Sequence, residues 1–364
     1  MNIAIIGGGN MGSVLAAKFS QQNNVNLYIS NRNGEIDQYL HNMKSINEDS
    51  KVVTTAKIAK ITDSLKEAID GAEYIFITYP HFLLEKLSKE MLPLLKNQNL
   101  IFIPGSGGAE LWFKSCIDCG CTISGLQRVH AVTRIIEKGK TVRESGVRAF
   151  LKSATIPAKY SHSISIVLSQ LYNMDVEVLD NYANITLINS NAILHTSRLY
   201  CLFKDYNKDI VYKSLPLFYE EWDIDSAQLL VDMDNELKTI LDYLSQCGMN
   251  MSGIIPLLEH YESTNIYELK NKLTSINSFK GLKTPSIRLE EGYIPDFDSR
   301  YFTSDFPYGL DLILSFAKVC NIDCPNMLMV SNWYHNLSGT DNSFNLSKFN
   351  INTPNDIISF YKNK

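Results

Sequence analysis

The stretch IAIIGGGNMGSVLAAKF, residues 3–19, decides the fold of the first third of the chain. An apolar run typical of a buried strand leads into Gly7, Gly9 and Gly12 in G-x-G-x-x-G spacing, and a helical pattern follows. In such a βαβ unit, the first glycine makes a tight turn, the second lets the backbone approach a pyrophosphate, and the third lets the helix pack on the strand. We therefore predict a dinucleotide-binding turn; a glycine turn without a ligand is the alternative. The predicted cofactor contacts are Gly7, Gly9, Asn10, Met11 and Gly12.

The end of the second predicted strand, SNRN at residues 30–33, bears on which dinucleotide binds. NAD-binding proteins usually place a carboxylate here, which bonds the ribose 2′-hydroxyl. Ser30 and Asn31 stand in its place, and Arg32 offers a cationic partner for a 2′-phosphate. The sequence therefore predicts NADP(H) in preference to NAD(H), with contacts from Asn31 and Arg32. The alternative is that Arg32 is a solvated loop charge.

Four more short apolar runs alternate with helical patterns up to about residue 125: VNLYIS, EYIFITYP, NLIFIPG and TISGLQ. This alternation is typical of a doubly wound α/β domain, in which helices cover both faces of a parallel sheet. We predict such a Rossmann domain over residues 1–184. Open α/β sheets bind ligands at the carboxyl ends of their strands, so Pro80 and Gly105 are further predicted cofactor contacts, with ordinary turns as the alternative.

The pattern changes after about residue 185 to long helical stretches, so a mainly α-helical second domain is predicted over residues 185–364. Leu230, Met233, Leu237, Ile240 and Leu244 recur three and four residues apart, which draws one apolar stripe on a helix. Gly248 is a predicted end signal for this helix. Pro325 is a predicted start for another, because proline suits the first helical turn.

Length and composition narrow the classes of function. A chain of 364 residues with 45% hydrophobic content is long enough for two cores. Its net charge is −5, without the basic stripe that nucleic acid requires. No apolar segment approaches the roughly 20 residues of a membrane span, and the N-terminus lacks signal-peptide features, so a cytoplasmic protein is expected. The seven cysteines are most simply free thiols, and no metal site is predicted; CIDCGC at residues 116–121 has only partial metal-ligand spacing.

The helical half contains two candidate groups for chemistry. Asn191 and His195 are four residues apart, so a helix places both on one face. Farther on, RYFTSDFPYGL at residues 300–310 combines Arg300 and Asp305 with four aromatic side chains. A carboxylate can orient a histidine that acts as general acid or base, and an arginine can hold a substrate carboxylate. The alternative for His195 is a hydrogen-bonded core residue.

The motifs together resemble those of the opine dehydrogenases, the octopine/nopaline dehydrogenase group. The resemblance covers nearly the whole chain and rests on GGGNMG at 7–12, PGSGG at 104–108, NSNAILH at 189–195, FYEE at 218–221, DNE at 234–236 and RYFTSDFPYGL at 300–310. It implies a Rossmann domain joined to a helical domain, and reductive condensation of an amino acid with a 2-oxo acid. It also implies roles for individual residues: His195 is the catalytic histidine, Asp305 its partner, Arg300 the contact of a substrate carboxylate, and Asn191 the asparagine one turn before the histidine.

Two positions depart from the family pattern. Thr196 follows the histidine where the family commonly has proline, and Phe306 replaces a small aliphatic residue. Tyr301 is a further candidate contact of the amino acid, with core packing as its alternative.

We therefore expect an NADPH-dependent opine dehydrogenase, with pyruvate as the favoured 2-oxo acid. One alternative is an NADP-dependent reductase of a simple 2-oxo or 3-hydroxy acid, which needs no amine. Another is a non-catalytic NADPH-binding sensor or scaffold, in which His195 is dispensable. The expected partners are small molecules, without nucleic acid or membrane. The oligomeric state stays open, with a homodimer as the candidate.

Overall fold

The computed structural model describes residues 1–30, 34–339 and 344–362. The chain divides into two compact units, Met1–Thr186 with Tyr361–Lys364, and Leu187–Phe360. The boundary between the units after Thr186 lies two residues beyond the predicted boundary at residue 184. The predicted end of the second domain, residue 364, differs more, because the chain returns to the first unit at Tyr361. Each unit is described by itself.

Tyr361 is fixed in the first unit by a buried carboxylate. Its hydroxyl donates to Glu110 Oε1 at 2.5 Å, and the Thr186 hydroxyl donates to the same oxygen at 2.6 Å. Glu110 has no exposed surface, and burial raises the pKa of its carboxyl to about 7, although these two hydrogen bonds act in the opposite direction. The Tyr361 side chain therefore ends on a polar group inside the first unit.

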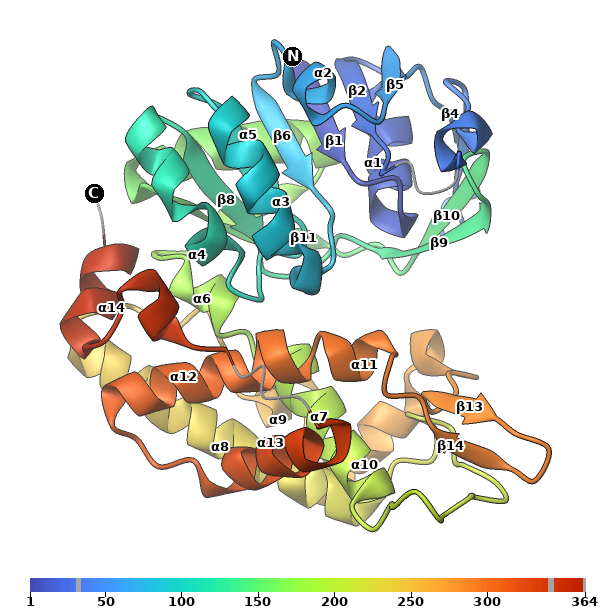
Figure 1. Ribbon diagram of the computed structural model, residues 1–364, viewed down its shortest axis with the longest axis vertical. Coiled ribbons are helices and arrows are strands. Elements are labelled where there is room, and N and C mark those ends of the chain that lie inside the picture. The colour runs from blue at the N-terminus through green and yellow to red at the C-terminus, as the bar shows by residue number, and fades with distance from the viewer. Residues whose placement is uncertain (31–33, 340–343, 363–364) are drawn as a thin grey trace. The chain divides into compact units, whose positions relative to one another are not determined.

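An eight-stranded sheet forms the centre of the first unit (Figure 1). Its strands are β1 (Asn2–Ile6), β2 (Asn24–Tyr28), β5 (Lys60–Thr62), β6 (Tyr74–Ile77), β7 (Asn99–Phe102), β8 (Thr122–Leu126), β11 (Phe150–Ile156) and β12 (Asp175–Val178). Six of them lie parallel in the order β5-β2-β1-β6-β7-β8, which is the strand order of a Rossmann fold and confirms the predicted class. The order reverses between β1 and β6. The strand β11 then pairs antiparallel to β8, an extension that the sequence did not indicate.

Helices cover both faces of this sheet. They are α1 (Asn10–Phe19), α2 (Leu65–Ile69), α3 (Leu84–Met91), α4 (Ala109–Phe113), α5 (Ser161–Tyr172) and α6 (Ala183–Thr186). Helices α1 and α5 lie on one face, where the Phe19 ring is 5.0 Å from that of Phe76 and 5.3 Å from that of Tyr172. Helix α3 lies on the other face (Figure 1). Burial of these aromatic rings stabilises the layered core.

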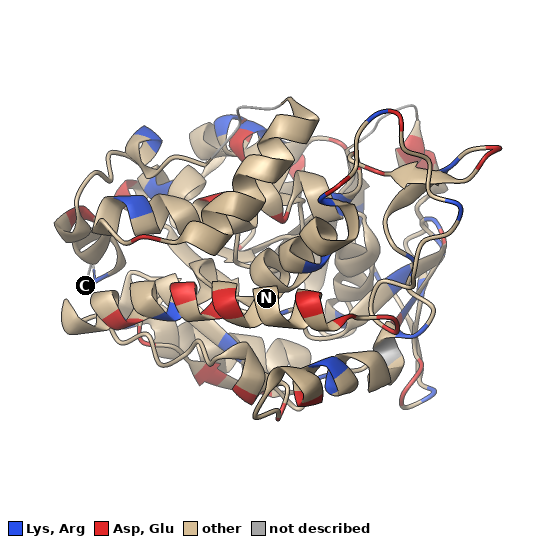
Figure 2. Ribbon diagram, turned by 90° about the horizontal axis from the view of Figure 1, so that it is seen from below, with Lys and Arg blue, Asp and Glu red and all other residues tan. Residues whose placement is uncertain are grey.

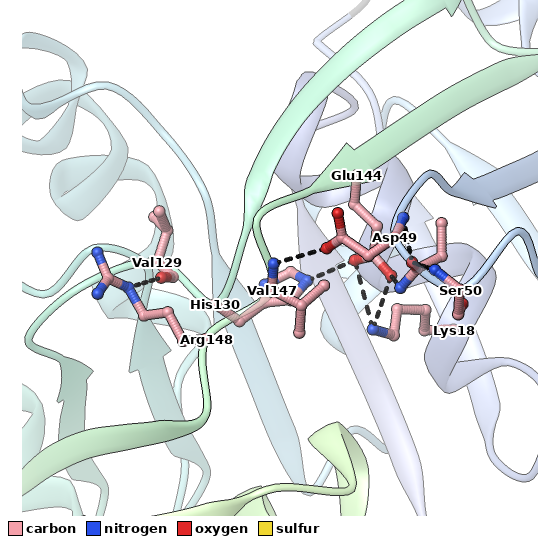
Figure 3. Close-up of polar contacts among 9 residues, drawn as sticks. Lys18, Asp49, Ser50, Val129, His130, Glu144, Val147 and Arg148 are labelled. Carbon is pink, nitrogen blue, oxygen red and sulfur yellow. Dashed lines mark hydrogen bonds and ion pairs between the residues drawn. The ribbon is translucent and has the colours of Figure 1, made fainter. Parts of the chain in front are cut away.

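A second, four-stranded sheet packs on α1 and was not predicted. It comprises β4 (Val53–Thr55), β3 (Lys44–Asn47), β10 (Thr141–Ser145) and β9 (Val132–Glu137). A buried polar cluster joins it to α1 and to the loop between β8 and β9 (Figure 3): Glu144 of β10 accepts from Lys18 Nζ of α1 at 3.1 Å and from His130 Nε2 of the loop at 2.8 Å. Asn47 of β3 also donates to this carboxylate at 3.0 Å. These contacts fix the small sheet beside α1.

The Glu144 cluster makes the stability of the first unit depend on pH. Burial opposes the charge of Glu144, but the hydrogen bond from His130 and the charge of Lys18 outweigh it and lower its pKa from 4.5 to about 2. A carboxyl pKa that is lowered by folding contributes stability above its ordinary value, and the contribution is lost as the pH falls towards the lowered value. The contribution here is about 3 kcal/mol. Burial also lowers the pKa of His130, so acid weakens the cluster from both sides.

We expect Glu144→Gln to lower the free energy of unfolding at pH 7 by a few kcal/mol, and the difference from wild type to shrink between pH 4.5 and pH 2. Urea unfolding at several pH values measures this. The control is Glu137→Gln, because Glu137 lies in the same small sheet but its side chain is 58% exposed in its ion pair with Lys140. A difference between Glu144→Gln and wild type that stays constant with pH contradicts the assignment.

The second unit is mainly helical, as predicted. Its helices are α7 (Ser190–Phe203), α8 (Ile224–Gln246), α9 (Leu257–His260), α10 (Ile266–Ser275), α11 (Arg300–Thr303), α12 (Asp311–Cys320), α13 (Pro325–Ser338) and α14 (Pro354–Tyr361), the last ending at the residue that joins the first unit. The predicted stripe of α8 is buried at all five positions. Gly248 has a positive φ of 83° just after α8, and Pro325 begins α13, as predicted. A hairpin of β13 (Ser286–Arg288) and β14 (Tyr293–Pro295) was not predicted.

The described part of the chain has mixed surface charge and free cysteine thiols. Figure 2 shows basic and acidic residues interspersed over the elements in view. The seven cysteines are free thiols. Among the described residues, no group of three or more His, Cys, Asp or Glu side chains is placed to hold a metal ion, and no helix is long and apolar enough to span a membrane.

Candidate active site

The glycine turn between β1 and α1 has the geometry that a dinucleotide needs. Gly7 has a φ of 118°, which only glycine adopts readily. A Cβ at Gly12 would lie 1.7 Å from the Gly7 carbonyl oxygen, so the helix packs against the turn as closely as glycine permits. A Cβ at Gly9 would meet no atom within 4 Å. The backbone at Gly9 thus borders open space at the start of α1, where the helix dipole favours a pyrophosphate.

The remaining predicted contacts in this turn have distinct places. Asn10 begins α1, and its side-chain oxygen accepts from the Ile135 backbone N–H at 2.7 Å, which ties the turn to β9. Met11 is half-buried and packs against the core of the first unit. Asn31 and Arg32, on which the NADP(H) prediction rests, lie outside the described residues.

Pro80 and Gly105 follow β6 and β7 at the carboxyl edge of the sheet, as predicted. Pro80 is half-buried and precedes a short turn of 3-10 helix. Gly105 is buried, and a Cβ there would lie 2.7 Å from Gly125 Cα and 2.8 Å from the Tyr182 hydroxyl oxygen. Close packing within the first unit therefore accounts for glycine at position 105.

In the second unit, the structure brings His195 and Asp305 together across 110 residues of sequence. His195 Nδ1 lies 2.7 Å from Asp305 Oδ2, and both side chains are largely buried. His195 belongs to α7, and Asp305 lies between α11 and a single π-helical turn, Phe306–Leu310. A carboxylate at this distance accepts the Nδ1 hydrogen and orients the ring, as the general acid–base reading requires.

The π-helical turn explains the motif FPYGL that follows the aspartate. Pro307 lies at the start of the turn, where a missing backbone N–H costs little. A Cβ at Gly309 would lie 2.9 Å from the Ala192 Cβ, so glycine lets the turn press directly on α7, one turn before His195. Such π-turns interrupt helices at functional sites. Here the interruption sets Asp305 against the histidine.

Tyr219 is a contact of His195 that the sequence reasoning missed. Its hydroxyl lies 2.7 Å from His195 Nε2, so both ring nitrogens have partners. Burial raises the pKa of Tyr219 well above its ordinary value, so the phenol keeps its proton at neutral pH. With Asp305 accepting from Nδ1, Nε2 is left to accept from the phenol. The available signal was the motif FYEE, in which the tyrosine had no assigned role.

A buried arginine fixes the segment that carries Tyr219. Arg198 has no exposed surface, and its guanidinium donates to the backbone oxygens of Phe218 at 3.2 Å and Glu221 at 2.7 Å. It also pairs with Asp223, the residue that caps the N-terminus of α8. Because Arg198 lies one turn after His195 in α7, the same helix holds the histidine and the segment opposite it.

The other predicted substrate contacts lie around this pair with different exposure. The Tyr301 ring centroid is 4.6 Å from that of His195. Arg300 begins α11 and is exposed, and no ion pair with it occurs among the described residues. Asn191 is exposed on α7, one turn before His195. The structure therefore brings Tyr301 to the histidine and leaves Arg300 and Asn191 accessible to a ligand.

The two departures from the family pattern are accommodated within the second unit. The Thr196 hydroxyl donates to the Ala192 backbone oxygen at 2.6 Å, so α7 continues without interruption through the histidine. Phe306 is fully buried, and its ring stacks on that of Tyr334 with centroids 4.2 Å apart.

Known proteins match both units. The family model for the α-helical domain of NAD/NADP octopine/nopaline dehydrogenases matches residues 178–338, and that for the N-terminus of NAD-dependent glycerol-3-phosphate dehydrogenase matches residues 2–111. Tauropine dehydrogenase from Arabella iricolor is 24% identical, over 93% of this chain and 92% of that protein. Octopine dehydrogenase from Pecten maximus is 27% identical, over 73% and 70%. The solved structure of octopine dehydrogenase with NADH and L-arginine has the same fold, with a TM-score of 0.86, 21% identity and coverage of 99% and 98%.

Proposed function

Because this chain belongs to the opine dehydrogenase family of NAD(P)-dependent oxidoreductases, we propose that it condenses the amine of an amino acid with a 2-oxo acid and reduces the resulting imine. The product is an N-(carboxyalkyl) amino acid. The observation that carries this proposal is the hydrogen-bonded pair of His195 and Asp305, held in the unit that matches the octopine/nopaline family. The family assignment removes the non-catalytic sensor as an alternative.

Each candidate residue of the second unit is assigned one task in this reaction. His195 exchanges protons with the substrates while the amine adds and water leaves, since a histidine can gain and lose a proton near neutral pH. Asp305 holds the Nδ1–H tautomer. Arg300 binds a substrate carboxylate with its planar donors. Asn191 and Tyr301 flank the histidine and contact the amino acid. The bound dinucleotide supplies the hydride, and the open backbone at Gly9 fits its pyrophosphate.

We further propose NADP(H) as the preferred dinucleotide and pyruvate as the 2-oxo acid. Ser30 and Asn31 replace the carboxylate that would repel a 2′-phosphate, and Arg32 supplies a cation for it. Pyruvate is supported by the resemblance of the motifs to the family, whose members often use it.

The test is NADPH oxidation followed at 340 nm, with pyruvate held constant and each amino acid supplied in turn. Parallel reactions contain NADH, omit the amino acid, or omit pyruvate. We expect oxidation that requires both substrates, and a higher kcat/KM with NADPH than with NADH. Oxidation with the oxo acid alone contradicts the condensation and identifies a simple reductase. A preference for NADH contradicts the role given to Arg32 and leaves the condensation intact.

A further inference from the structure

The hydroxyl of Tyr219 occupies the position from which a substrate would otherwise exchange a proton with His195. Nε2 is the ring nitrogen that Asp305 leaves available, and the Tyr219 oxygen lies 2.7 Å from it. The phenol is held in place: the Tyr219 ring stacks on Phe279 with centroids 4.1 Å apart, and only 4% of the residue is exposed. In this arrangement, a proton that leaves or reaches Nε2 has to pass through the Tyr219 hydroxyl.

We propose that Tyr219 is a catalytic residue that relays the proton between His195 and a substrate oxygen; this inference rests on the proposed condensation. The step is the loss of water from the adduct of amine and oxo acid. Tyr219 gives its hydroxyl proton to the departing hydroxyl group, and the C–O bond breaks as water leaves with the bonding electrons. The nitrogen lone pair forms the C=N bond. Protonated His195 passes its Nε2 proton to the Tyr219 oxygen, so histidine ends neutral, tyrosine is unchanged, and the positive charge moves to the iminium.

The hydrogen-bonding capacity of the phenol supports this assignment. A hydroxyl has one hydrogen to donate and two lone pairs. Within the described residues, His195 is the one hydrogen-bond partner of the Tyr219 hydroxyl. When protonated histidine donates from Nε2, the phenolic hydrogen has to turn to another acceptor, and a substrate oxygen supplies one. A buried donor left without an acceptor is costly, so protonation of His195 and binding of the substrate oxygen favour each other.

Arg198 is the positioning residue for this relay. It donates to the backbone oxygens on either side of Tyr219 in sequence, Phe218 and Glu221. A shift of about 1 Å in a catalytic group can lower a rate 100-fold. The guanidinium therefore fixes the distance between the phenol and the imidazole from the same helix that carries the imidazole.

The experiment is Tyr219→Phe, which removes one oxygen atom and keeps the stacked ring. We expect kcat for the condensation to fall about 100-fold, within the range for loss of one proton-transfer group, while KM for each substrate stays within about threefold. The matched control is Tyr206→Phe, a half-buried tyrosine of the same unit that stacks on Tyr212 and should keep wild-type kinetics.

A second readout separates this inference from the proposed function. Nitrogen NMR of histidine-labelled, substrate-free protein should show the Nε2 signal of His195 change in Tyr219→Phe and stay unchanged in Tyr206→Phe. A changed signal with kcat within threefold of wild type overturns the relay, because the hydrogen bond then has no kinetic role. An unchanged signal also overturns the relay, because it means that the Tyr219 hydroxyl is not hydrogen-bonded to Nε2 in solution. A wild-type protein without amine-dependent oxidation overturns the proposed function itself, and the relay step with it.

Discussion

Gly12→Ala is expected to weaken dinucleotide binding, raising the dissociation constant for NADPH about 100-fold or more, which corresponds to about 2.7 kcal/mol or more. The added Cβ would lie 1.7 Å from the Gly7 carbonyl oxygen and 2.9 Å from the Thr78 hydroxyl oxygen. Neither neighbour is the far end of a flexible chain, so α1 has to move away from β1 and the turn loses its shape. Fluorescence titration with NADPH measures the loss. Overpacking of this kind also destabilises the fold, by roughly 1–3 kcal/mol.

Gly9→Ala tests the contact between the glycine turn and the pyrophosphate without disturbing the fold. Its Cβ meets no atom within 4 Å, and Gly9 has a negative φ of −74°. The melting temperature should therefore match that of wild type, while the methyl group projects into the space expected for the pyrophosphate and weakens NADPH binding. Unchanged NADPH affinity in both glycine variants would place the cofactor elsewhere.

His195→Ala is expected to lower kcat for the amine-dependent reaction by about 1,000-fold, since a positioned acid–base group contributes 10²–10⁴. NADPH affinity should stay within about twofold, because the glycine turn lies in the other unit. Steady-state oxidation at 340 nm and the same titration measure the two quantities.

Asp305→Asn is the companion variant to His195→Ala. It keeps the shape of the side chain but removes the charge beside Nδ1 and favours the other ring tautomer, so we expect a loss of kcat of similar or larger size, roughly 10³- to 10⁴-fold. If kcat of His195→Ala stays within threefold of the wild-type value, His195 is a hydrogen-bonded core residue, which is the alternative stated in the sequence analysis.

The local patterns predicted the Rossmann domain because each of its elements carries its own signal. The apolar runs at 3–6 and 74–77 are buried strands, and the spacing of Gly7, Gly9 and Gly12 places a turn between strand and helix. The four-stranded sheet on α1 escaped prediction because Lys44–Asn47 and Val53–Thr55 are short and polar. The place of β3 depends on pairing with β10, about 100 residues away, and β4 in turn pairs with β3.

The candidate site shows the same division between local and distant signals. Asn191 and His195 could be placed on one helix from their spacing, whereas only the family resemblance linked His195 to Asp305. Tyr219 lay in the motif FYEE without an assigned role, and Arg198 had no local signature. A tyrosine beside a phenylalanine and an arginine on a helix are ordinary in sequence, and their roles arise from hydrogen bonds that the tertiary fold creates.

The return of Tyr361 to the first unit has a consequence for how the chain is made. A ribosome releases residues 1–186 long before Tyr361 emerges, so during synthesis the nascent first unit has Glu110 without one of its two hydroxyl donors. Its hydrogen bonds are completed only after Tyr361 has been synthesised and has returned to the first unit. A fragment of residues 1–186 should therefore form a less stable first unit than a chain that includes Tyr361.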